Sequence, residues 1–135
     1  AMEKIEEYFQ DGGKCLGAFY NEQMVAYSWC HYKDRYFPFF NYSIEVKDRV
    51  YIGPDYVAPE FRGNKIHCCL LTKMLDILFK EGCRYVLSSV LQSNHASKKG
   101  LASAGFLPQK KVHVKRVFKT MVCKNIEQID RWDIQ

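Results

Sequence analysis

The clearest chemical signal in the sequence is the stretch VAPEFRGNKIHCC, residues 57–69. A β-branched run ends at a proline, and Arg62-Gly63 then opens a segment whose apolar residues recur at helical spacing. Free N–H groups at a helix start, with the helix dipole behind them, favour a negatively charged group. The stretch therefore predicts a phosphate-binding turn. The alternative is an ordinary strand-to-helix turn with solvated basic side chains.

A second turn of this kind follows one helix and one strand later, in NHASKKGLASAGF, residues 94–106. Asn94 can cap the next helix, Ser97 lies in its first turn, and Gly105 can end it. Taken alone, each of these residues has a structural explanation. Two such turns at this separation are less easily explained by chance, and together they favour a shared ligand site.

The elements that must position the two turns follow from hydrophobic periodicity and from turn residues. We expect a helix over 3–10, strands over 15–20 and 24–32, a loop or short edge strand over 34–42, strand composition in two pieces over 43–57, a helix over 66–81, a central strand buried on both faces over 83–91, a helix over 95–104, a strand or strand pair over 112–123 and a polar tail over 124–135. Since proline cannot donate to a ladder, pairing should lapse at Gly53-Pro54, at a bulge or where two strands part.

This order predicts the α/β class, with an α+β mixed sheet, in one domain over residues 1–135. The strand–helix–strand centre requires a parallel pair with a crossover. Ligands of open sheets bind at the carboxyl ends of the strands. We therefore expect the 57–67 and 91–97 turns to lie side by side.

Composition limits the class of protein further. The chain has 135 residues, of which 47% are hydrophobic and 26% charged, as in a soluble globular domain. No apolar run approaches the length that spans a bilayer, and the charged start predicts no export signal. The six cysteines include no CxxC pair and no zinc spacing, so we expect free thiols, no metal and a cytoplasmic location. The net charge of +5 suits an anionic partner.

Together these residues resemble the GNAT superfamily of acyl-CoA N-acyltransferases over roughly residues 15–107. VAPEFRGNKI is similar to the superfamily's V-x-P-x-x-R-G-x-G-I signature, and the second turn is similar to its N-x-x-(A/S)…G-F signature. The resemblance implies a GNAT-like fold with acetyl-CoA or coenzyme A as the acyl donor. It also implies that an amine attacks the thioester directly and takes the acetyl group.

The same resemblance implies which residues bind the coenzyme. Backbone amides of the first turn would bind the pyrophosphate. Amides of the strand before that turn would bind the acyl carbonyl and the pantetheine arm, and Asn94 would contact the coenzyme. The implied binding residues are Tyr56, Val57, Arg62, Gly63, Asn64, Lys65, Ile66, His67 and Asn94. The signature's second glycine is here Lys65 and its next small residue is His67. Their side chains would narrow the slot, or Lys65 would pair with a phosphate.

Catalytic groups are less clearly marked, because the chain departs from the family. Leu101 stands where many members have a tyrosine acid, and residues 51–55 contain no glutamate base. The amine must still lose a proton. The candidate catalytic residues are Asp55, Glu60 and His67 as the base, and Ser97, with Tyr56 as an alternative, beside the leaving thiolate. Each also has a structural explanation, as a solvated turn residue or a helix-start residue.

Three expectations concern partners. Compared with the superfamily, the chain looks N-terminally truncated, which would leave the outer edge of the strand over 15–20 unpaired. We therefore expect an upstream domain or a homodimer to cover the face near residues 15–42. The alternative is that residues 3–10 fold over this edge as a helix and leave a monomer. The alternative functions are a coenzyme A-binding domain without catalysis and a nucleic-acid-binding module. The second would use the basic run over 109–119, which is equally explained as a solvated edge. We expect neither nucleic acid nor a membrane as partner.

Overall fold

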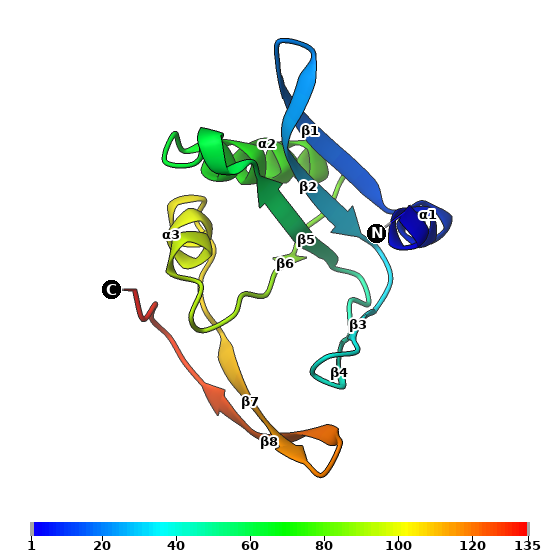
Figure 1. The fold of residues 1–135 in the computed structure, drawn as a ribbon, viewed down its shortest axis with the longest axis vertical. Helices are drawn as coiled ribbons and strands as arrows, with labels where there is room; N and C mark the ends of the chain where they lie inside the picture. The colour runs from blue at the N-terminus through cyan, green and yellow to red at the C-terminus, as the bar shows by residue number, and fades with distance from the viewer. Residues whose placement is uncertain (1, 135) are drawn as a thin grey trace.

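The computed structural model describes residues 2–134 and shows a mixed α/β fold (Figure 1). The elements are α1 (Met2–Gln10), β1 (Lys14–Tyr20), β2 (Gln23–His31), β3 (Arg35–Phe37), β4 (Tyr42–Ile44), β5 (Val50–Val57), the 3-10 turn η1 (Pro59–Phe61), α2 (Ile66–Lys80), β6 (Val86–Leu87), α3 (His95–Ser103), β7 (Lys110–Val117) and β8 (Thr120–Gln128). A four-stranded sheet has the order β1-β2-β5-β6, and β3–β4 and β7–β8 form separate two-stranded sheets. The predicted mixed sheet is confirmed.

The predicted interruption at Gly53-Pro54 is present in both of its expected forms. Against β2, the register of β5 shifts between Ser28 and Cys30, which is a bulge. Against β6, the parallel pairing stops after Val50↔Val86 and Tyr51↔Leu87. The carboxyl half of β5 is therefore paired on one side only, as a strand must be if a ligand is to reach its backbone.

The predicted central strand over 83–91 is wrong in length and in burial. Only Val86 and Leu87 form a strand, and both are half-buried. Within residues 2–134 β6 is an edge of the sheet, because β7 pairs with β8 and not with β6. An apolar run predicts contact with the core but cannot show how many partners a strand has.

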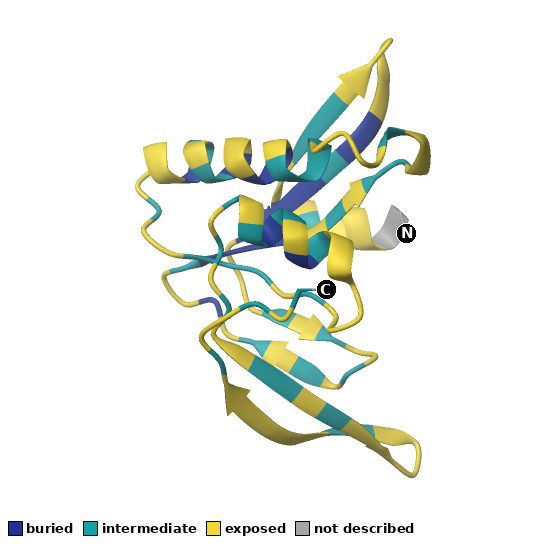
Figure 2. Cartoon of the chain, turned by 90° about the vertical axis from the view of Figure 1, so that its left-hand side faces the viewer, coloured by how far each residue is buried: buried dark blue, intermediate teal, exposed yellow. Residues whose placement is uncertain are grey.

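Helix α2 places its apolar face on the sheet, as its periodicity predicts (Figure 2). Leu70, Met74 and Leu78 are buried, and Leu71 is buried completely. The core cluster comprises Cys30, Val50, Ile52, Leu71, Met74, Leu78 and Leu101. Each large aliphatic side chain there contributes roughly 1.5–3 kcal/mol by its removal from water. This packing fixes α2, and with it the turn at its amino end.

Helix α1 packs on the other face of the sheet. Side chains alternate along a strand, so Cys30 points into the core under α2 while its neighbours Trp29 and His31 point the opposite way. The rings of Tyr8 and Phe9 meet the Trp29 ring edge-on, at centroid distances of 5.2 and 5.0 Å. The two faces of the sheet therefore differ: one carries α2 and α3, and the other an aromatic layer.

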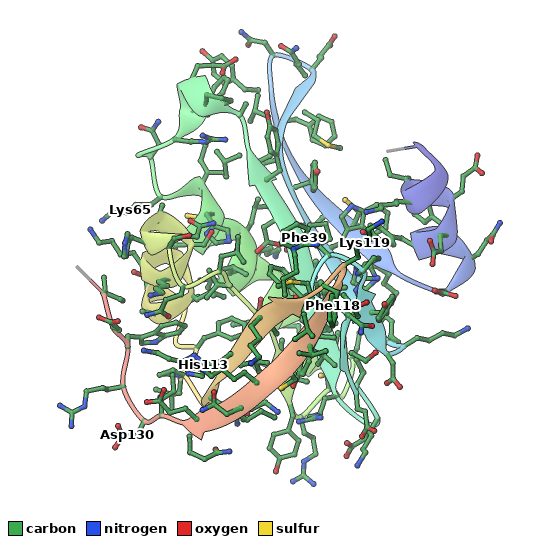
Figure 3. All side chains as sticks on the ribbon, turned by 60° about the horizontal axis from the view of Figure 1, so that its bottom comes forward. Phe39, Lys65, His113, Phe118, Lys119 and Asp130 are labelled. Carbon is green, nitrogen blue, oxygen red and sulfur yellow. The ribbon has the colours of Figure 1, made fainter. Side chains whose placement is uncertain are left out.

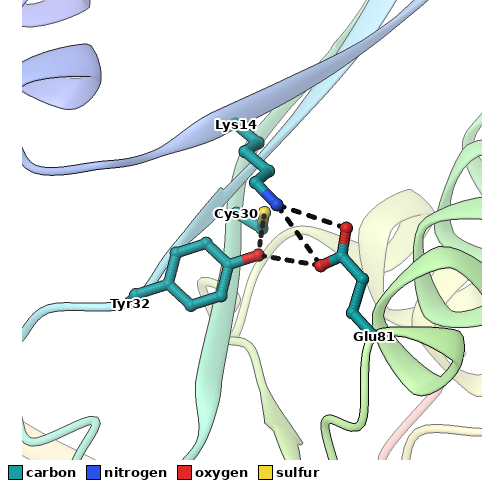
Figure 4. Close-up of polar contacts among 4 residues, drawn as sticks. All are labelled: Lys14, Cys30, Tyr32 and Glu81. Atoms are coloured by element: carbon teal, nitrogen blue, oxygen red, sulfur yellow. Dashed lines mark hydrogen bonds and ion pairs between the residues drawn. The ribbon is translucent and has the colours of Figure 1, made fainter.

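A polar tether joins the hairpin to the far end of α2 (Figure 4). Lys14 Nζ donates to Glu81 Oε1 at 3.2 Å, and the Tyr32 hydroxyl donates to Glu81 Oε2 at 3.4 Å. Burial, aided by the Cys30 thiol, raises the pKa of Tyr32 to about 12. Such exposed contacts add little stability, typically about 0–1 kcal/mol each. The tether lies at the opposite end of α2 from the 57–67 turn.

The carboxyl-terminal part is more ordered than the sequence predicts. The strand pair over 112–123 is confirmed, but the polar tail over 124–135 is wrong within the described residues, since β8 continues to Gln128. Trp132 then returns to the core cluster and donates from Nε1 to the Phe106 carbonyl at 2.9 Å. The buried Lys98 donates to the Asp133 carbonyl at 3.1 Å. These contacts bind the end of the chain to α3.

The β7–β8 hairpin itself projects from the body of the protein (Figure 1). Phe118 and Lys119 form its tip, and the Phe118 side chain is 96% exposed (Figure 3). Near the tip, Asn41, in the turn between β3 and β4, donates to the Met121 carbonyl at 3.1 Å. The basic residues of the predicted nucleic-acid surface therefore lie on this hairpin, away from the helices.

Candidate functional site

The turn before α2 presents a row of free backbone donors. After η1, Gly63 and Lys65 have positive φ values of 81° and 61°, and the helix begins at Ile66. The amides of residues 63–68 donate to no acceptor among residues 2–134; the next amide, of Cys69, donates to the Lys65 carbonyl at 3.0 Å. The positive end of the helix dipole lies behind these six amides. This is the geometry of an anion-binding turn.

Lys65 shows why glycine suits this position in the related signature. Its φ of 61° and ψ of 20° are left-handed, a conformation that costs a side-chain-bearing residue about 1–2 kcal/mol and glycine nothing. The Lys65 side chain is exposed and extends from the surface of the protein (Figure 3). This position thus has a left-handed backbone although it is not a glycine.

His67 has a fixed place under the turn. Its Nε2 lies 2.9 Å from Asp55 Oδ2, and the hydroxyl of the buried Ser28 donates to Asp55 Oδ1 at 2.6 Å. The side chains of His67 and Asp55 are only 20% and 15% exposed. When neutral, the ring donates from Nε2 to the carboxylate, which leaves Nδ1 as its acceptor. Two of the four catalytic candidates are therefore in direct contact.

The strand before the turn ends in a carbonyl held by Arg62. The Ala58 amide donates to the Val25 carbonyl at 2.8 Å, so the N–H and C=O of Ala58 point toward β2. Because these directions alternate along an antiparallel strand, the N–H and C=O of Val57 point away from β2 and those of Tyr56 point toward it. Arg62 Nε donates to the Val57 carbonyl at 2.9 Å. The Val57 amide is thus a donor on the open side of β5, next to the free amides of the turn.

The two helices that follow the predicted turns, α2 and α3, contact each other. A Cβ placed on Gly100 of α3 would collide with the His67 ring, so the two residues touch. Asn94 caps α3 as predicted: its Oδ1 accepts from the Ser97 amide at 3.2 Å. Ser97 is half-buried near this cap, and Leu101 is 4% exposed in the core. Glu60 is exposed, and within residues 2–134 its side chain has no hydrogen-bond partner and no ion pair.

Three polar side chains near the site were missed at the level of sequence. They are Ser28, Ser88 and Ser89. Ser88 Oγ donates to the Ile52 carbonyl at 2.8 Å, and the hydroxyl of Ser89 bonds that of Tyr51, both where β5 and β6 part. The only sequence signal is a serine inside an apolar strand run, and without the register that signal names no partner.

Several other expectations can be placed on the structure. All six cysteines are free, and residues 2–134 contain no cluster of three potential metal ligands. Among the helices of the same part of the chain, none is long and apolar enough to cross a bilayer. On the basic hairpin, Lys111 pairs with Asp133 at 3.8 Å and His113 with Glu127 at 3.0 Å.

Parallel strands that part beside a helix start with free amides agree with the arrangement that the sequence resemblance implies. A family model described as the acetyltransferase (GNAT) family matches residues 1–106, and the chain belongs to this family. A search of curated proteins finds no match. The family, fold class and enzyme class predicted from the sequence are confirmed.

Solved structures give the same fold. An aminoglycoside N-acetyltransferase AAC(6')-Iy in complex with CoA is 21% identical, with 86% of this chain and 84% of that chain covered and a TM-score of 0.65. A ribosomal-protein-alanine N-acetyltransferase from Brucella melitensis biovar Abortus 2308 is 16% identical, with 85% and 79% covered and a TM-score of 0.61. An aminoglycoside 6'-N-acetyltransferase AAC(6')-Ih from Acinetobacter baumannii is 18% identical, with 87% and 82% covered and a TM-score of 0.59.

Proposed function

We propose that the protein uses acetyl-CoA to acetylate an amine and binds the coenzyme pyrophosphate at the amides of residues 63–68. The observation that carries this proposal is the row of six free amides at the start of α2, in a chain of the acetyltransferase family. The similar AAC(6')-Iy structure contains CoA, which supports the same donor here. Lys65 contributes one of the six amides, and Asn94 caps α3 on the second turn.

The acyl end of the donor belongs where β5 and β6 part. The Val57 amide offers a donor to the pantetheine arm or to the acyl carbonyl on the open side of β5. The amine attacks the thioester carbon, a C–N bond forms, the C–S bond breaks and the thiolate leaves. Tyr56 and Ser97 are the candidate proton donors to that thiolate.

For the proton lost by the amine, we assign the Asp55–His67 pair as the acceptor. His67 holds the carboxylate through Nε2, and its Nδ1 lies against Gly100 of α3, so the amine proton is taken up at the Asp55 carboxylate, which His67 orients. Ser28 fixes the carboxylate in turn. Glu60 is the weaker candidate, because no contact in residues 2–134 orients it.

Calorimetric titration with CoA and acetyl-CoA tests the donor site. We expect a dissociation constant in the micromolar to sub-millimolar range, about −5 to −8 kcal/mol. Arg62→Ala should weaken binding by about 1–3 kcal/mol, since Arg62 holds the end of the strand and brings a charge to the turn. Lys80→Ala, at the far end of α2, is the matched control. Absence of heat and of a thermal shift at millimolar CoA would overturn the proposal.

We further propose that a second copy of the chain covers the outer edge of β1, in a cytoplasmic homodimer. Helix α1 packs on Trp29 instead of along this edge, and within residues 2–134 no strand pairs with the edge. Phe19 and Tyr20 are 64% and 59% exposed beside it. Unpaired edges favour association. Light scattering that gives the 15.9 kDa monomer at every concentration would refute the dimer.

A further inference from the structure

We propose that the tips of the β3–β4 and β7–β8 hairpins bind the surface of an anionic lipid membrane. The inference goes beyond the proposed function, because no residue of these tips belongs to the turn at α2. It starts from a contact between two turns. Asn41, in the β3–β4 turn, donates from Nδ2 to the Met121 carbonyl at 3.1 Å and accepts from the Tyr36 hydroxyl at 2.9 Å. The two turns are therefore side by side, and Figure 3 labels Phe39 and Phe118, one from each.

The joined turns expose large aromatic side chains to solvent. Phe39 and Tyr36 are 68% and 54% exposed, and Phe118 is the most exposed of the three. Among the side chains of residues 4–134, neither the core cluster nor the apolar side chains packed on it include any from residues 35–44 or 110–128. Apolar residues scattered singly over a surface need no explanation, but three rings on two joined turns indicate an interaction surface.

The fold does not explain the phenylalanine at position 118. Its φ of 56° is left-handed, and in a two-residue hairpin turn this conformation favours glycine or asparagine. Because the ring is almost fully exposed, packing does not offset the strained backbone. Strained residues of this kind cluster at functional sites. A partner outside the chain would account for Phe118.

The same turns carry unneutralised positive charge. Residues 35–44 and 112–126 contain no aspartate or glutamate. Four exposed cations lie around the β7–β8 turn: Lys115, Arg116, Lys119 and Lys124. Among the side chains of residues 4–134, none of the four forms an ion pair, whereas Lys111 and His113, at the base of the hairpin, both do. The tip half of the hairpin therefore combines exposed rings with free cations.

The order of these groups along the hairpin fits a membrane surface. Phe118 lies at the extremity, Arg116 and Lys119 lie next to it, and Lys115 is about 10 Å behind it at roughly 3.3 Å per residue. Interfacial apolar side chains enter a membrane by about 5–10 Å, and nearby lysines and arginines are attracted to anionic headgroups. With the rings at the acyl boundary, the cations lie at the level of the headgroups.

Other partners fit this patch less well. A second copy would bring its own patch to the same two-fold axis and oppose cations to cations. Single-stranded nucleic acid stacks successive bases on rings along a groove, whereas the exposed rings here are confined to the tips. The sequence predicts no membrane partner because it has no run that spans a bilayer, and a surface contact requires none.

The proposed contact leaves the donor site open. Figure 1 shows the β7–β8 tip and the amino end of α2 at opposite ends of the molecule. The affinity for CoA should therefore be the same in Phe118→Asn and in the unmodified protein. A shared effect on CoA and on lipid would contradict two separate surfaces.

Sedimentation of the full chain with vesicles tests the proposal. We expect at least about tenfold tighter binding to phosphatidylcholine vesicles with about 30% phosphatidylserine than to phosphatidylcholine alone. Phe118→Asn should weaken this binding about tenfold, because an apolar ring is lost. Asparagine suits the left-handed turn, so the melting temperature should be kept or raised. Lys119→Gln should weaken binding about fivefold. Phe79→Ala and Lys73→Gln, at exposed positions of α2, are the matched controls and should bind normally.

Fluorescence separates insertion from other contacts. The emission of Phe118→Trp, compared with that of the unmodified protein, should shift to the blue when the phosphatidylserine vesicles are added, because the indole ring leaves water. Equal binding to both kinds of vesicle, tip variants that bind as the controls do, or an unshifted emission would each overturn the inference. So would binding of an oligouridylate probe without vesicle binding, or a dimer that Phe118→Asn converts to a monomer in light scattering.

Discussion

His67 on the first turn of α2 and Gly100 on α3 are in contact so close that no side chain fits at Gly100. In the related signature the position of His67 holds a small residue, and here a ring fills the space between the two helices. The absence of a side chain at Gly100 and the presence of one at His67 are therefore complementary.

This complementarity predicts a compensating pair of mutations. Gly100→Ala should destabilise the fold by about 1–3 kcal/mol, because the added methyl group forces the His67 ring to move. The same change in a His67→Ala background should cost less or be neutral. Urea unfolding of the four proteins gives the coupling energy, and strictly additive effects would show that the two residues do not interact.

Replacement of the proposed proton acceptor should affect turnover more than binding. We expect Asp55→Asn, which removes the carboxylate, and His67→Ala on the following turn, which removes the ring that orients it, to lower kcat by up to about 10²–10⁴-fold, as for loss of a general base, while the affinity for CoA changes little. Glu60→Ala is the control, since Glu60 lies on the same turn without a partner among residues 2–134. Steady-state kinetics and titration of each variant decide. A loss of kcat in Glu60→Ala but not in His67→Ala would reverse the assignment.

His31 should make stability depend on pH. Burial lowers its pKa to about 4 in the folded protein against an ordinary value of 6.5, so the unfolded chain binds the proton more readily. The free energy of unfolding is therefore highest above pH 6.5, where His31 is neutral in both states, and it falls by at most about 3 kcal/mol as the pH falls toward 4. Urea unfolding at pH 7 and pH 5 measures this loss. His31→Gln should reduce it, whereas His113→Gln, on the exposed hairpin, should leave it in place.

The family's usual tyrosine should not be restorable by a single change. Leu101 is 4% exposed in the core cluster, so Leu101→Tyr overpacks the site and should cost about 1–3 kcal/mol of stability. Lys99→Tyr, at an exposed position of the same helix, should cost far less. Thermal unfolding compares the two. A stable Leu101→Tyr protein with raised transfer would show that the core accommodates the ring.

The parts of the site that depend on short stretches of chain could be predicted from the sequence. The Asn94 cap, the Arg62-Gly63 turn and the interruption at Gly53-Pro54 follow from local conformational preferences. The Ser28–Asp55–His67 contacts could not be predicted, because the first of them depends on which residue of β2 stands opposite Asp55. Whether β6 is a central or an edge strand could not be predicted either, since that depends on the strand with which β7 pairs.

The β7–β8 hairpin also determines the long-range electrostatic attraction between the protein and charged molecules. Residues 110–128 contain six of the 20 lysines and arginines and one of the 15 acidic residues, so the rest of the chain has 14 of each and no net charge. The protein is therefore electrically a neutral body with a positive arm. A polyanion should meet the arm first at low salt, and beyond about 8 Å this attraction is screened at physiological salt. Coenzyme A, in contrast, is drawn to the turn at α2 by local dipoles and side chains rather than by the net charge of the body.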